Sequence, residues 1–68
     1  MKVCLRHEDQ GDATTFTDCG WGELHSLLAM LQAVGVYHDG GVYREMEYQI
    51  VLGPVEAYAE IILTGEPE

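Results

Sequence analysis

Positively charged residues are scarce in this chain of 68 residues. It has three Lys and Arg against twelve Asp and Glu, which gives a formal net charge of −9 at pH 7. A protein so poor in cations does not attract the phosphates of nucleic acid or anionic lipid. The charge therefore predicts no direct binding to nucleic acid and no binding to a membrane, and it favours a partner with a basic surface.

A long apolar run is also missing. The first twenty residues include Lys2, Arg6 and four acidic residues, so no signal-peptide core is present. No stretch approaches the roughly 18 to 20 apolar residues that a membrane-spanning helix needs. We expect a cytoplasmic protein.

Cysteine is too rare for a disulfide scaffold, because the chain has two, Cys4 and Cys19. We expect both thiols to be reduced, with one disulfide as the alternative. Hydrophobic residues make up 47% of the chain, which is enough to form a core. The length predicts a single domain, residues 1–68.

Motifs for catalysis and metal binding are absent. There is no C-x-x-C or H-x-x-x-H pair, and Cys4 to His7 is a loose C-x-x-H. Ser26 is the only serine, and no spacing pairs Cys19 with a histidine as a nucleophile. The acidic stretch 8–12 does not follow the EF-hand order of calcium ligands. We expect a protein that is not an enzyme and uses no metal or cofactor.

Residue periodicity does predict structure. Alternation of apolar and polar residues predicts a strand over 1–7, and β-branched and aromatic residues predict a second strand over 14–17. Leu24, Leu28 and Leu31, with Trp21, repeat at helical spacing and predict a helix over 20–34. Asp18 is the expected N-cap, and Gly35 the expected C-terminal glycine.

The second half alternates again. Residues 42–52 are expected to form one strand, interrupted by Gly53 and Pro54. Residues 55–64 fit a strand or a helix, and their apolar alternation and β-branched end favour the strand. The order strand, strand, helix, strand, strand predicts an α+β fold, with a small antiparallel sheet of about four strands and one helix packed on one face.

Carboxylates recur at regular spacing on these strands. Glu45 and Glu47 leave one face of their strand about 6.6 to 6.8 Å apart, and a neighbouring strand adds Glu56 and Glu60. A tight turn at Gly53 places Glu47 opposite Glu60, unless the register is looser. The expected partner-binding residues are Glu45, Glu47, Glu56 and Glu60, with Tyr43 and Tyr58 beside them and Glu8, Asp9 and Asp12 as a second patch. The alternative is an acidic face kept for solubility.

In size, α+β pattern and acidity, the chain resembles the small acidic anti-defence proteins encoded by phages, among them anti-CRISPR proteins that mimic DNA. The resemblance covers composition and involves no shared motif. It implies an inhibitor that occupies a basic nucleic-acid-binding surface of a larger complex, in the cytoplasm of the host cell.

A second hypothesis concerns the helix. Its side opposite the leucines has almost no charge where a solvated helix normally carries Lys and Glu. This side consists of Ser26, Ala29, Met30 and Ala33. It suits the interface of a homodimer in a structural or assembly protein, because small residues allow close approach. Coverage by the chain's own residues 35–41, or simple exposure, is the alternative.

Overall fold

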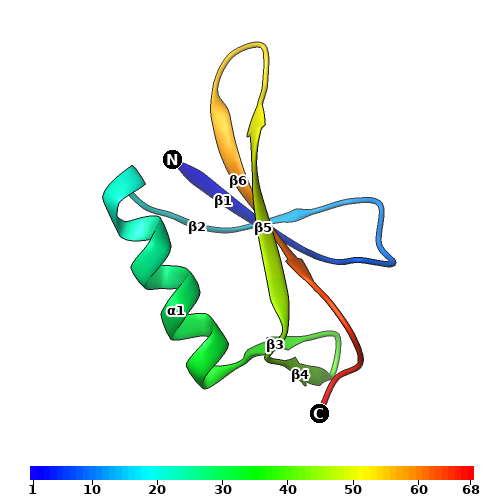
Figure 1. Ribbon diagram of the computed structural model, residues 1–68. Coiled ribbons are helices and arrows are strands. Elements are labelled where there is room, and N and C mark those ends of the chain that lie inside the picture. Colours follow the sequence, from blue (N-terminus) through cyan, green and yellow to red (C-terminus); the bar gives the residue numbers. More distant parts are fainter.

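The computed structural model describes all residues 1–68, as one helix and two sheets (Figure 1). The elements are β1 (Lys2–His7), β2 (Thr14–Asp18), the 3-10 turn η1 (Trp21–Glu23), α1 (Leu24–Val34), β3 (Val36–His38), β4 (Gly41–Tyr43), β5 (Met46–Leu52) and β6 (Ala57–Leu63). Four strands form the main sheet in the order β2-β1-β6-β5, and β3 pairs with β4. The predicted α+β class is confirmed.

Strand pairing in the main sheet departs from the prediction at one place. β1 with β2 and β5 with β6 are antiparallel, but β1 and β6 are parallel, so the sheet is mixed. β6 contains Ala59, Ile61 and Leu63, all fully buried. A strand this apolar is stabilised best in the middle of the sheet, and there it lies parallel to β1.

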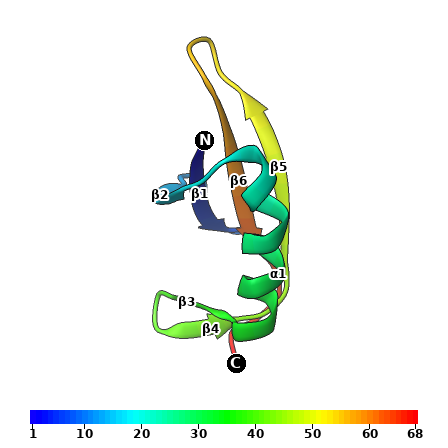
Figure 2. The ribbon, with the colours of Figure 1, turned by 90° about the vertical axis from the view of Figure 1, so that its left-hand side faces the viewer.

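The hydrophobic core lies between the sheet and α1, which covers one face (Figure 2). We call this the helix face and the opposite side the outer face. Val3 and Leu5 of β1 join the apolar residues of β6, and α1 contributes Leu24, Leu28 and Leu31. The predicted faces of these elements are therefore confirmed.

The helix begins later than expected. Trp21 lies in η1 and is 62% exposed. Asp18 does not cap the helix, because its carboxylate accepts a hydrogen bond from the N-terminal amine at 3.1 Å. At the other end the prediction is confirmed: Gly35 has φ 91°, and its N–H donates to the carbonyl of Leu31.

The predicted strand over 42–52 is divided. Arg44 and Glu45 separate β4 from β5, and β4 pairs with β3, which was not expected. Asp39 and Gly40 connect them with φ of 48° and 84°. Two positive φ values are typical of a type I′ hairpin turn, for which Asp-Gly is a favoured pair. Within the segment 55–64, residues 57–63 form a strand, as favoured.

The C-terminal residues pack against β4. The N–H of Glu68 donates to the carbonyl of Val42 at 2.7 Å, and its carboxylate lies 2.9 Å from Nε of Arg44. Gly41 faces Pro67 so closely that a Cβ at position 41 would overlap the proline ring. The absence of a side chain at Gly41 therefore allows Pro67 and Glu68 to pack against β4.

Two neighbouring isoleucines test the assignment of the faces. Ile61 is fully buried on the helix face, whereas Ile62 is only partly buried on the outer face. Ile61→Ala should lower the free energy of unfolding by about 2–5 kcal/mol, because it leaves a cavity in a packed core. Urea denaturation followed by circular dichroism measures the loss. Ile62→Ala is the control, and an equal loss in both variants would contradict the assignment.

Candidate functional site

The predicted acidic residues do not form one surface. Glu60 lies on the outer face with its side chain only 11% exposed, and its Oε1 accepts a hydrogen bond from Nε of Arg6 at 2.8 Å. Gln49, directly opposite Glu60 in the β5–β6 register, donates to the same oxygen at 3.2 Å. Glu60 is therefore paired within the fold, and its carboxylate is not exposed as the expected partner contact requires.

Arg6 also holds the turn that follows β1. Its Nη1 donates to the carbonyls of His7, Glu8 and Gln10 at 3.3, 3.4 and 3.0 Å. One guanidinium thus neutralises Glu60 and orders the backbone that carries Glu8 and Asp9. Planar, multidentate binding of this kind is characteristic of arginine.

Three other expected residues, Tyr43, Glu56 and Tyr58, have different surroundings. Tyr43 is buried, with its ring centroid 5.1 Å from that of His7 and 6.3 Å from that of His38, so it does not lie on an exposed surface as expected. Glu56 is exposed but lies 3.9 Å from Nζ of Lys2. Tyr58 is half-buried on the outer face, opposite Lys2 in the β1–β6 register.

The outer face consequently has mixed charge. Lys2 and Arg6 lie on it together with Glu47 and Glu60. Glu47 is opposite Ile62, not Glu60, because the register is looser than a tight turn at Gly53 requires. The regularly spaced carboxylates expected on this face are therefore interspersed with two cations of the same chain.

Exposed carboxylates gather instead where the β1–β2 turn, the β3–β4 turn, the start of β5 and the C-terminal segment meet. Asp9, Asp39 and Glu66 line one hollow there, and Glu45 and Glu66 line another together with the Arg44–Glu68 pair. Glu8 joins them because its N–H donates to the carbonyl of Leu63 at 2.9 Å. We give the name acidic end to the five residues Glu8, Asp9, Asp39, Glu45 and Glu66. Asp12 is also exposed, further along the β1–β2 turn.

Hydrogen bonds of His7, Gln10 and His38 hold the segments of the acidic end together. Oε1 of Gln10 lies 2.8 Å from Nε2 of His38, and its amide nitrogen donates to Asp39 at 3.0 Å. Nδ1 of His7 accepts from the N–H of Asp9 at 3.1 Å, so Nε2 carries the proton that it donates to the carbonyl of Gly65 at 2.9 Å. These bonds connect segments that are far apart in the sequence.

Sequence reasoning missed Asp39 and Glu66 as members of this surface. The Asp-Gly pair at 39–40 was a usable signal, because it predicts a hairpin turn that exposes its aspartate. Glu66 carried no signal, since its position depends on how the tail packs on β4.

The uncharged side of α1 is open. Ser26, Ala29, Met30 and Ala33 are all exposed, and residues 35–41 do not cover them. Val34 at the end of α1 and Tyr37 in β3 are also exposed, at 67% and 75%. An apolar surface of this kind is typical of protein–protein contacts.

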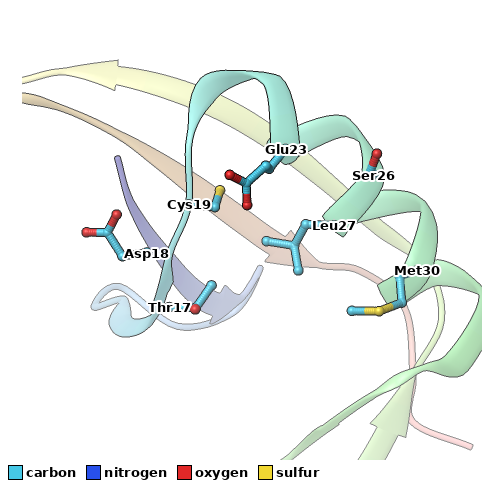
Figure 3. A pocket seen from close by; sticks show the side chains of 7 residues that line it. All are labelled: Thr17, Asp18, Cys19, Glu23, Ser26, Leu27 and Met30. Carbon is cyan, nitrogen blue, oxygen red and sulfur yellow. The ribbon is translucent and has the colours of Figure 1, made fainter.

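A hollow of about 370 Å³ separates α1 from the end of β2 (Figure 3). Leu27, Met30 and Cys19 give it apolar walls, and the carboxylates of Asp18 and Glu23 lie toward one end. No lysine or arginine lines it. The N-terminal amine of the same chain lies 3.1 Å from the carboxylate of Asp18.

Both cysteines are free. Cys4 is on the outer face, opposite Glu60, whereas Cys19 packs against the core on the helix side. No group of three or more His, Cys, Asp or Glu side chains is arranged to hold a metal ion. None of the helices has the length and hydropathy required to span a membrane.

Comparison with known proteins gives no relative. The chain matches no protein-family model, no curated protein and no solved structure.

The Arg6–Glu60 pair gives the site's first test. Arg6→Ala should lower the free energy of unfolding by about 1.5–3 kcal/mol, because it removes a charged hydrogen bond and leaves Glu60 largely buried without a cation. Guanidinium or thermal denaturation measures the change. Lys2→Ala removes an exposed pair of 3.9 Å and should cost about 0.5 kcal/mol or less. Equal losses would show that Arg6 has no special role.

Proposed function

We propose that this chain is a non-catalytic acidic binding protein that occupies a basic, nucleic-acid-binding surface of a larger complex, in the manner of DNA-mimicking anti-defence proteins in the cytoplasm. The observation that supports the proposal most is the pairing of every cationic side chain within the fold. Lys2 lies near Glu56, Arg6 binds Glu60, and Arg44 binds Glu68.

Nine of the twelve acidic side chains have no lysine or arginine partner, and all nine are exposed. Five form the acidic end, and the others are Asp12, Asp18, Glu23 and Glu47. Carboxylates held on ordered turns can replace phosphates against lysine and arginine. Long-range attraction also speeds association with a basic surface and weakens as salt screens the charges.

The acidic end differs from the contact surface expected from the sequence. It keeps Glu45, Glu8 and Asp9, with Glu47 nearby on the outer face, and it adds Asp39 and Glu66. Glu56 and Glu60 are omitted, since both lie beside cations of the same chain. The proposed contact therefore moves from a sheet face to one end of the molecule.

Charge reversal tests the proposal. Glu45→Lys with Glu66→Lys should reduce recovery of the partner from host lysate by about tenfold or more, because like charges at an interface cost several kcal/mol. Wild type and variant are compared by affinity capture at low and high salt, with mass spectrometry of the bound proteins.

A matched control carries the same charge change elsewhere. Glu23→Lys with Glu56→Lys alters exposed carboxylates away from the acidic end and should keep most of the binding. If both double variants lost binding equally, net charge alone would explain the interaction. If neither lost it, the acidic end would not be the contact.

Assembly through the uncharged side of α1 is the second candidate, favoured by the exposure of Met30, which is 54% accessible in the structure. Met30→Glu should abolish self-association through that surface, because a dimer would bury the added charge. Sedimentation equilibrium measures the mass. A wild-type chain that stayed at 7.6 kDa at all concentrations would rule this candidate out.

A further inference from the structure

The two edges of the main sheet differ. β2 is short, and its register with β1 shifts between Val3 and Cys4, where Phe16 is an extra residue. Irregularity of this kind prevents another strand from pairing at an edge. β5 pairs with β6 over seven residues without a shift, contains no proline, and has Glu47 as its one charged residue. Figure 2 shows β5 along one side of the sheet with no strand beyond it.

Hydrogen bonds at both ends of the β5–β6 hairpin show which residues bond outward. The N–H of Thr64 donates to the carbonyl of Glu45 at 3.0 Å, and the N–H of Gly53 donates to the carbonyl of Glu56 at 3.1 Å. Bonded pairs alternate along an antiparallel ladder. The backbone groups that point to the open edge therefore belong to Met46, Tyr48, Ile50 and Leu52.

Those outward residues also carry exposed apolar side chains. Tyr48 is 52% exposed and Leu52 is 82% exposed, on the helix face where core residues would be expected. An edge with unpaired backbone groups and open apolar side chains is a template for strand addition.

We propose that β5 pairs antiparallel with β5 of a second copy of this chain, about a two-fold axis at Gln49, and joins two four-stranded sheets into one. Gln49 is the midpoint of β5. About this axis Met46 lies opposite the partner's Leu52, and Tyr48 lies opposite the partner's Ile50. This register pairs every outward-pointing residue of both strands.

A second copy fits this edge because the register separates like charges. Glu47 falls opposite the partner's Val51, and the two glutamates lie about 13 Å apart along the strands. The axis places both copies of α1 on the same face, and α1 contains no Asp, Glu, Lys or Arg. The net charge of each chain still opposes association, so self-pairing should strengthen as salt rises, whereas binding to a basic partner should weaken.

Position 51 tests the register directly. Val51→Lys puts a cation opposite the partner's Glu47 and should tighten the dimer, while Val51→Glu puts a like charge there and should loosen it. Each dimer contains two such cross-strand pairs, so we expect a change in dissociation constant of roughly 2- to 30-fold in each direction. Sedimentation equilibrium at several salt concentrations measures it, with circular dichroism to show that each variant is folded.

Val55→Lys and Val55→Glu are the charge controls. Val55 is 94% exposed and lies outside β5, so both variants should dimerise almost alike, apart from the small effect of net charge. Opposite effects at position 51 with none at 55 would support the pairing. Equal effects at both positions would overturn it.

A backbone test is independent of side-chain charge. Tyr48→Pro removes an N–H that points to the open edge, so the sheet loses no internal hydrogen bond, whereas Tyr48→Ala keeps that N–H. We expect the proline variant to be a folded monomer and the alanine variant to keep dimerising. Met30→Glu should not affect this dimer. A wild-type chain that is monomeric at every concentration and salt, or a dimer that Met30→Glu alone disrupts, would overturn the proposal.

Discussion

The position of β6 between β1 and β5 is the constraint on which the rest of the structure depends. Its fully buried residues Ala59, Ile61 and Leu63 face α1. Its polar residue Glu60 faces the other way and binds Arg6. With β6 and β1 in the interior of the sheet, β2 and β5 form its edges. The same arrangement places Glu60 of β6 beside Arg6 of β1 on the outer face.

Burial explains which parts of the fold the sequence predicts. Alternation in β1 and β6 and the leucine spacing of α1 report directly on the hydrophobic face, and these elements are where the pattern places them. β3 is only three residues long, too short for periodicity to identify. β1 and β6 are far apart in the sequence, so the residue pattern within either strand does not predict that the two pair in parallel.

The candidate surface was predictable only in part, for a related reason. Sequence shows how many carboxylates there are but not which cations lie beside them. Glu60 and Glu45 look alike in the sequence, yet one binds Arg6 and the other is exposed at the acidic end. Alternation along one strand over 42–52 places Tyr43 on the same face as Glu45 and Glu47. In the structure the strand breaks between β4 and β5, and Tyr43 is buried in the core.

The parallel contact of β1 with β6 also has a consequence for how the chain folds. β1 with β2 and β5 with β6 are hairpins that form from nearby residues, but Lys2 meets Tyr58 only when almost the whole chain has come together. Closing so long a loop has an entropic cost before any contact compensates it, which slows folding. The β1–β6 contact between the two hairpins should therefore form late, and its formation should be the rate-limiting step of folding.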